Sequence, residues 1–157
     1  SLWNARFTYL VEELGEKMSE TLRFWMEEGK SVTGVEVQRA NEARTHLFRE
    51  VESWFTDIDL LVTPTLTRPA IAADHDPREP IMLDNQTADV PRASWYPYTH
   101  PFNLSGHPAI TVPCGFTSGG LPVGLQIVGP WLADAKVLHA AACFERARPW
   151  ADRRPAV

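Results

Sequence analysis

The chain has 157 residues, of which 44% are hydrophobic and 22% charged, and its formal net charge is -5. This length suits one domain or part of a larger one, and the composition is that of a packed globular protein rather than a disordered or fibrous one. Apart from Arg153-Arg154 the basic residues form no cluster, so the charge gives little basis for binding nucleic acid.

The chain start and the two cysteines bear on the cellular setting. No apolar run approaches the roughly 20 residues that cross a bilayer, and no signal-peptide pattern follows Ser1, so we expect a cytoplasmic protein without a membrane contact. Cys114 and Cys143 form no Cys-x-x-Cys pattern, which predicts small core residues rather than a disulfide or a zinc site. A first residue other than Met, followed directly by a helical pattern, favours a piece of a longer polypeptide.

Residues 1–57 carry the pattern of a helical hairpin. Apolar side chains keep a 3.6-residue period from Phe7 to Met26, which predicts one amphipathic helix of about 25 residues that Gly29 ends. Thr33-Gly34-Val35-Glu36 then matches a capping box, with Val32 and Val37 placed for a hydrophobic staple. A second apolar stripe runs on to Phe55 and stops near Asp57, so a second helix is expected there.

Residues 58–102 predict a strand followed by a long proline-rich loop. Leu60-Leu61-Val62 reads as a short buried strand, and prolines then interrupt every periodic pattern up to Pro101. We expect Ser94 to cap a short helical piece holding residues 95–99, which Pro101 distorts or ends. Loops this long are usually functional or disordered.

Residues 103–150 predict a strand pair and a final helix. The runs 109–116 and 123–128 are apolar or β-branched and flank Thr117-Ser118-Gly119-Gly120, where a glycine can supply a positive φ, so they should form an antiparallel hairpin. Asp134 is expected to cap a helix that closes near Pro149. Its predicted apolar face consists of Val137, Leu138, Ala141 and Phe144. The chain is therefore expected to mix helices and strands in an α/β arrangement.

The runs Asn103–Phe116 and Gly120–Gly129, preceded by Asp59–Thr65, resemble the C-terminal part of amidase signature hydrolases. The resemblance implies that residues 1–157 form the C-terminal part of a single amidase domain, whose fold is a large mixed sheet flanked by helices. This piece would supply the last strands and an outer helical layer. Gly106, Gly124 and Gly129 fit folding roles in this picture, since glycine allows a tight backbone path or a close approach.

Members of this family hydrolyse carboxylic amides with a Ser nucleophile, a second Ser in a cis peptide and a Lys, all from a Gly/Ser-rich core that precedes the part present here. The chain has no Ser-Ser pair and no Gly-Gly-Ser run, and Lys17, Lys30 and Lys136 fall on predicted helix surfaces. We therefore predict no catalytic residue, no metal and no cofactor in this chain, and expect it to be inactive without the missing N-terminal part of the same protein.

Three other groups invite a catalytic interpretation, and we favour a structural one for each. Ser105 lacks the Gly-x-Ser-x-Gly elbow and is expected to satisfy backbone groups near Gly106. His100 and His107 stand seven apart, which is not the i, i+4 spacing of a helical zinc pair. Asp57 and Asp59 lie where a helix passes into a strand, so they are expected to form a turn rather than a carboxylate pair.

The resemblance also implies substrate-binding residues. In the family, the short helix before the Asn-Leu-Ser/Thr-Gly motif faces the acyl pocket, which makes Tyr96, Thr99 and His100 candidates, with Tyr96 first. Amidotransferase subunits that release ammonia from glutamine carry an acidic residue at the place of Tyr96, whereas an aromatic wall favours apolar or aryl amides. The same aromatics could instead simply pack this segment onto the sheet, and both interpretations remain open.

The predicted activity is amide hydrolysis to a carboxylate and ammonia or an amine, through an acyl-enzyme. One alternative is a glutamine amidotransferase A-type subunit that works beside partner subunits, and another is a noncatalytic scaffold fragment. The expected partners are a small-molecule amide and the missing N-terminal part, and a homodimer through the helical layer is possible.

Overall fold

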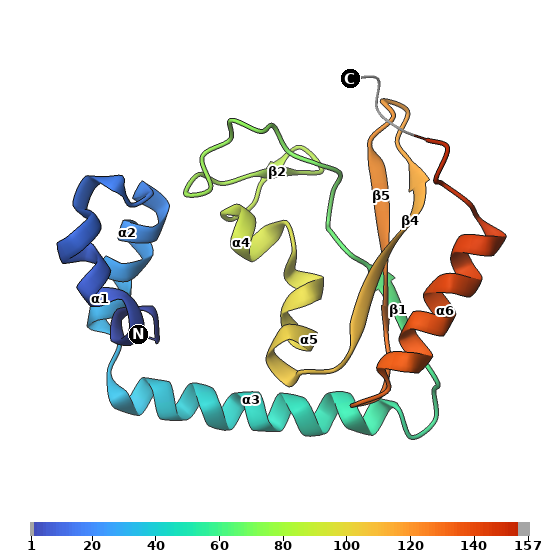
Figure 1. Ribbon diagram of the computed structural model, residues 1–157, viewed down its shortest axis with the longest axis horizontal. Coiled ribbons are helices and arrows are strands. Elements are labelled where there is room, and N and C mark those ends of the chain that lie inside the picture. Colours follow the sequence, from blue (N-terminus) through green and yellow to red (C-terminus); the bar gives the residue numbers. More distant parts are fainter. Residues whose placement is uncertain (1, 154–157) are drawn as a thin grey trace. The chain divides into compact units, whose positions relative to one another are not determined.

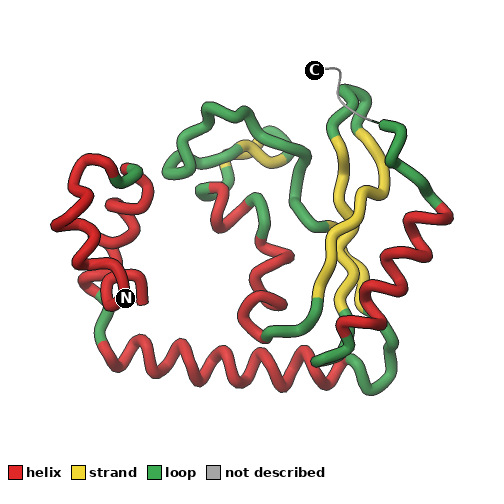
Figure 2. Tube along the Cα trace, in the orientation of Figure 1, coloured by secondary structure: helices red, strands yellow, loops and turns green. Residues whose placement is uncertain are grey.

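The computed structural model describes residues 2–153, and the side chains of residues 7–153 except 12 and 16. Two compact units divide the chain, Ser1–Thr45 and His46–Val157, and each is described by itself. Helices and strands are mixed, as the sequence predicts (Figures 1 and 2).

The first unit is helical, but the continuous helix predicted from Phe7 to Gly29 is wrong. Helix α1 (Leu2–Leu14) ends in a 3₁₀ turn, Gly15–Lys17, and α2 (Glu20–Glu28) begins anew. Gly15 has a φ of 48°, and the Ser19 hydroxyl accepts a hydrogen bond from Leu22 N at 3.3 Å. A left-handed glycine followed by an N-cap serine breaks a helix even where the apolar period continues.

Helix α3 (Gly34–Trp54) begins in the first unit and continues into the second. Its predicted capping box is confirmed. Glu36 Oε2 accepts from Thr33 N at 2.7 Å and from the Thr33 hydroxyl at 2.8 Å, while Glu36 N donates to Thr33 Oγ1 at 3.3 Å. The amide donors at a helix start have no partner within the helix, so this exchange fixes where α3 begins.

A three-stranded antiparallel sheet forms the centre of the second unit. The strands are β1 (Leu61–Pro64), β4 (Ala109–Phe116) and β5 (Pro122–Val128), in the order β1-β5-β4. The predicted hairpin is thus confirmed, with Gly120 at a φ of 82° in its turn. β1 is less buried than expected, because it lies at an edge and Val62 is 52% exposed.

The two faces of the sheet bury different clusters. Helix α6 (Asp134–Ala147) packs against β4 and β5, where Val112, Ile127 and Ala141 are buried (Figure 1). On the other face, Val128 is buried with Val51 of α3 and Phe102 of α5 (His100–Ser105). Successive residues of a strand point to opposite faces, so Ile127 and Val128 belong to separate cores.

Three predictions about α6 and the cysteines need correction. The N-cap is Ala133, so Asp134 is the first residue of the helix rather than its cap. Leu138 is 60% exposed and lies off the buried face that Val137 and Ala141 occupy. Cys143 is exposed and Cys114 only partly buried, so neither is a fully buried core residue.

The close approach predicted at Gly129 is confirmed. A Cβ at this position would lie 2.6 Å from Val137 Cγ2, at the start of α6. The strand end and the helix can therefore approach this closely only because residue 129 has no side chain.

The proline-rich segment that follows β1 forms a loop whose two ends are joined by hydrogen bonds, and we call this junction the base of the loop. Thr67 N donates to Trp95 O at 2.9 Å, the Thr67 hydroxyl donates to Ser94 O at 2.6 Å, and Trp95 Nε1 donates to Arg68 O at 3.1 Å. The intervening residues hold a small hairpin, β2 (Met82–Leu83) with β3 (Gln86–Thr87), and the short helix α4 (Pro91–Ser94).

Two predictions within this segment are wrong. Ser94 ends α4 instead of capping a helix, and its hydroxyl accepts from Asp89 N at 2.8 Å. Pro101 occupies the first turn of α5 instead of ending a helix. A proline fits there because first-turn amides have no helical partner.

Candidate acyl-binding site

The three predicted substrate-binding residues lie together in residues 95–100, which we call the Tyr96 turn. Tyr96 leads into a 3₁₀ turn, Pro97–Thr99, and its carbonyl accepts from the Thr99 hydroxyl at 2.9 Å. The Tyr96 ring meets the His100 ring edge-on, with centroids 5.4 Å apart. Tyr96 also contacts Trp95 at a centroid distance of 6.3 Å, so the aromatics form a continuous partly buried cluster.

An open apolar groove of about 400 Å³ lies against this turn. It is lined by residues of α3, β1, the Tyr96 turn and α5, namely Trp54, Leu61, Thr63, Pro97, Tyr98, Pro101 and Phe102. Tyr98, which is 42% exposed, lines the groove, whereas Tyr96 and His100 lie on the same turn outside its lining. Such a surface suits an aromatic ring or an alkyl group of a ligand and offers few polar side chains to a charged ligand.

Gln126 is a residue of this site that the sequence did not indicate. Its side chain is buried under the Tyr96 turn, and Nε2 donates to Tyr98 O at 3.0 Å and to the Thr63 hydroxyl at 2.9 Å. Its place in the middle of a strand was readable from the sequence. Its bond to a turn 28 residues away depends on the tertiary fold.

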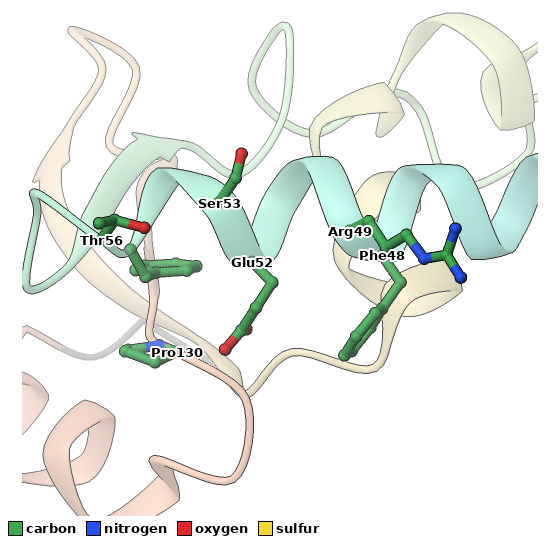
Figure 3. Close-up of a pocket in the computed structure, with 7 residues that line it drawn as sticks. Phe48, Arg49, Glu52, Ser53, Thr56 and Pro130 are labelled. Carbon is green, nitrogen blue, oxygen red and sulfur yellow. The ribbon is translucent and has the colours of Figure 1, made fainter.

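A second pocket, of about 430 Å³, lies along the C-terminal half of α3. Figure 3 shows Phe48 and Glu52 leaving α3 on the side of Pro130, while Ser53 leaves on the opposite side. Glu52 Oε2 lies 2.8 Å from His107 Nε2 and accepts from Trp131 N at 3.3 Å. Since a carboxylate only accepts, Nε2 carries the hydrogen of the first bond.

Ser105, His107 and Glu52 form a hydroxyl–imidazole–carboxylate series, yet its geometry favours a structural role. Ser105 Oγ lies 2.9 Å from His107 Nδ1, and both residues are buried. Neither lines the pocket beside Glu52, so the hydroxyl has no path to a substrate there. A nucleophile must reach the reacting carbon, and this buried serine lines neither of the two pockets described here. Its partner is the His107 ring rather than the backbone groups near Gly106 that we expected.

The remaining polar candidates are surface groups. Lys136 pairs with Asp59, and the hydrogen bond from its ammonium, together with its charge, lowers the pKa of the Asp59 carboxyl. Lys30 pairs with Glu27 on α2. Among the described side chains, those of residues 7–153 except 12 and 16, no three His, Cys, Asp or Glu side chains are grouped to hold a metal ion. Over the same residues, no helix combines the length and hydropathy that a membrane span requires.

Comparison with known proteins identifies the family of this chain. The sequence model of the Amidase family matches residues 7–138. An acylamidase of Rhodococcus erythropolis is 41% identical over 133 residues, which is 83% of this chain and 27% of that protein. The A-type subunit of the glutamyl-tRNA(Gln) amidotransferase of Synechococcus elongatus is 36% identical over 119 residues, covering 76% of this chain and 23% of that protein.

A solved structure gives the same assignment. A bacterial aryl acylamidase of the amidase signature family superimposes with a TM-score of 0.79 at 29% identity, covering 97% of this chain and 34% of that one. The chain therefore belongs to the amidase signature family, as the resemblance predicts. It spans about a quarter to a third of the length of these relatives.

Proposed function

We propose that the protein containing this chain is an amidase, which hydrolyses a carboxylic amide to a carboxylate and ammonia or an amine. In this proposal residues 1–157 are the C-terminal part of one amidase domain and provide its scaffold and part of its acyl pocket. The Ser-Ser-Lys set of the family would come from the rest of the protein and form the acyl-enzyme. The chain by itself is then expected to be inactive.

The observation that carries the proposal is the aromatic cluster of the Tyr96 turn beside an apolar groove. The family resemblance implies that the acyl pocket lies at this turn. The contacts of the Tyr96 ring with His100 and Trp95 hold that ring in place. Apolar groups gain by leaving water for such a surface. An aryl or otherwise apolar amide is therefore the substrate class that we propose, and the names of the acylamidase relatives agree with it.

A glutamine amidotransferase component is the second candidate, and it is favoured by the similarity to the A-type subunits of glutamyl-tRNA(Gln) amidotransferases. Glutamine carries an α-ammonium and an α-carboxylate, so its binding needs charged partners. The Tyr96 turn presents aromatic rings at the place where the family resemblance implies an acidic residue in glutamine-binding members. This difference favours the amidase.

The test uses the whole protein that contains this chain, with benzamide as an aryl amide, acetamide as a small polar one, and glutamine. Tyr96→Asp should lower kcat/KM for benzamide about tenfold more than for acetamide. The reason is that the new carboxylate at position 96 would have to lose its water when the benzamide ring binds beside it. Tyr96→Phe keeps the ring and should retain the preference. Tyr9→Asp, an exposed change in the first unit, is the matched control.

Two results would contradict the proposal. Equal losses on benzamide and acetamide would remove Tyr96 from the acyl pocket. Glutamine as the preferred amide of the unaltered protein would favour the amidotransferase alternative.

A further inference from the structure

Gln126 is a buried polar residue in the middle of the sheet. It lies on β5, the central strand, and only 3% of it is exposed. It shares a face of the strand with Val128, which is the face covered by α3 and α5. Buried amides are retained where their hydrogen bonds are specific, because an unsatisfied one costs stability.

The orientation of the Gln126 amide is fixed by its partners. Tyr98 O can only accept, so the group facing it at 3.0 Å must be the NH₂ of the amide. The second hydrogen goes to the Thr63 hydroxyl at 2.9 Å, and this hydroxyl donates onward to Pro64 O at 3.0 Å. Both amide hydrogens are therefore used, and neither a carboxylate nor a hydrocarbon side chain could replace them.

Thr63 and Tyr98, the two residues that Gln126 binds, both line the apolar groove. The hydrogen bonds within the Tyr96 turn are local, such as the one from the Thr99 hydroxyl to Tyr96 O. Two long-range contacts reach the backbone of this turn: Thr67, three residues beyond β1, donates to Trp95 O at its start, and Gln126 donates from β5 itself to Tyr98 O in its middle. Gln126 thus connects Thr63 and Tyr98, which both line the groove, without lining the groove itself.

We propose that Gln126 is a positioning residue for substrate selection. It holds the Tyr96 turn in a fixed position against β1 and β5 and so fixes the shape of the groove. This inference rests on the proposed amidase function. Gln126 acts through Tyr98 and Tyr96 and does not itself touch the substrate. Its loss should therefore affect substrates that fill the groove more than small ones that do not.

The first experiment reads the turn without any activity. The tyrosines of this chain are Tyr9, Tyr96 and Tyr98, and labelling the whole protein with 3-fluorotyrosine gives each of them a ¹⁹F signal that a single Tyr→Phe variant assigns. Gln126→Met keeps an unbranched side chain of similar length but donates no hydrogen bond. It should move or broaden the Tyr96 and Tyr98 signals and leave Tyr9, in the first unit, unchanged. Gln86→Met, at an exposed position of β3, is the matched control.

The second experiment measures selectivity in the whole protein. Gln126→Met should lower the ratio of kcat/KM for benzamide to that for acetamide about fivefold to tenfold, chiefly through a higher KM for benzamide. If this variant does not fold, Gln126→Asn keeps the amide but shortens its reach, and the same direction is expected.

The outcomes separate this inference from the proposed function. Unchanged ¹⁹F signals, or equal losses on benzamide and acetamide, would overturn the role of Gln126 while leaving the amidase proposal intact. Shifted Tyr96 and Tyr98 signals in a protein that hydrolyses no amide would support positioning of the turn by Gln126 and contradict the amidase proposal.

Discussion

Glu52 and His107, 55 residues apart in the chain, are joined by a hydrogen bond of 2.8 Å between Glu52 Oε2 and His107 Nε2. The His107 ring is fully buried and packs against the rings of Phe48 and Phe55, at centroid distances of 5.4 and 5.6 Å. Glu52 thereby ties α3 to the segment that leads into β4. This contact explains how a polar ring can be buried inside an aromatic cluster.

Removing the Glu52 carboxylate should show how far the stability of the fold depends on its hydrogen bond with His107. Glu52→Ala leaves the buried Nε2–H of His107 without its partner, so we expect the free energy of unfolding to fall by about 1–3 kcal/mol. Urea denaturation monitored by circular dichroism measures this loss. Glu50→Ala, an exposed change on the same helix, should stay within about 0.5 kcal/mol of the unaltered chain. Similar losses in the two variants would contradict the role given to Glu52.

The contact between Gly129 and Val137 gives a second prediction. Gly129→Ala places a methyl group 2.6 Å from Val137 Cγ2, so we expect a loss of about 1–3 kcal/mol in unfolding free energy. Combining it with Val137→Ala should recover part of this loss, which a double-mutant cycle measures. Gly34→Ala is the control, because nothing lies within 4 Å of its new methyl group, and it should be neutral or stabilising. Additive effects at 129 and 137 would show that the steric contact is absent.

Asp76 provides a test by titration. The guanidinium and the backbone N–H of Arg78 both donate to its carboxylate and lower its pKa from 3.8 to about 2. A depressed folded-state pKa stabilises the fold above the ordinary value, and this contribution is lost as the pH falls from about 4 toward 2.

Arg78→Ala should raise the pKa of Asp76, though not fully to its ordinary value, because the backbone N–H of residue 78 remains. Carboxyl carbon shifts followed by NMR against pH give the measurement. Lys136→Ala should raise the pKa of Asp59 and leave Asp76 unchanged. An Asp76 titration that does not respond to Arg78→Ala would contradict the assignment.

The capping box at the start of α3 predicts a stability difference that depends on pH. The backbone N–H and then the hydroxyl of Thr33 lower the pKa of Glu36, so this box stabilises the helix above the ordinary pKa of 4.5 and loses effect as the pH falls. Thr33→Ala should cost roughly 1 kcal/mol at pH 7 through loss of the N-cap.

Thermal unfolding at pH 7 and at pH 3 measures this difference, which should shrink at the lower pH. Thr45→Ala is the control, since the Thr45 hydroxyl donates to Asn41 O within the helix and caps nothing. If Thr33→Ala lowers the stability by the same amount at both pH values, the capping effect of Thr33 does not depend on the ionised Glu36 carboxylate.

Some local patterns in the sequence predicted local structure correctly, whereas the helix caps predicted at Ser94 and Asp134 were wrong. The capping box and the β4–β5 hairpin depend on neighbouring residues, and both are confirmed. The break at Gly15 was missed because the apolar period continues across it, although Ser19 followed by Glu20 is a recognisable helix start. Boundaries were therefore less predictable than the elements themselves.

The candidate site was only partly readable from the sequence. The family resemblance indicated the Tyr96 turn, but the spacing along β5 could tell only that Gln126 shares a face with Val128. Its two hydrogen-bond partners lie 28 and 63 residues away, and such pairing follows from the strand order β1-β5-β4. The groove lining depends on the same long-range contacts.

The closed base of the proline-rich segment has a consequence for how the second unit folds. β4 and β5 are joined by a short turn and can pair early, whereas Thr63 of β1 lies 63 residues from Gln126 and must wait for a large loop to close. The hydrogen bonds between Thr67 and Trp95 bring together positions 28 residues apart. If that base forms first, the loop that β1 must close shortens to about 35 residues, which lowers the entropic cost of pairing by about 0.5 kcal/mol. A base at Thr67 and Trp95 that formed early would therefore let the edge strand β1 pair with an existing β4–β5 hairpin at a lower entropic cost.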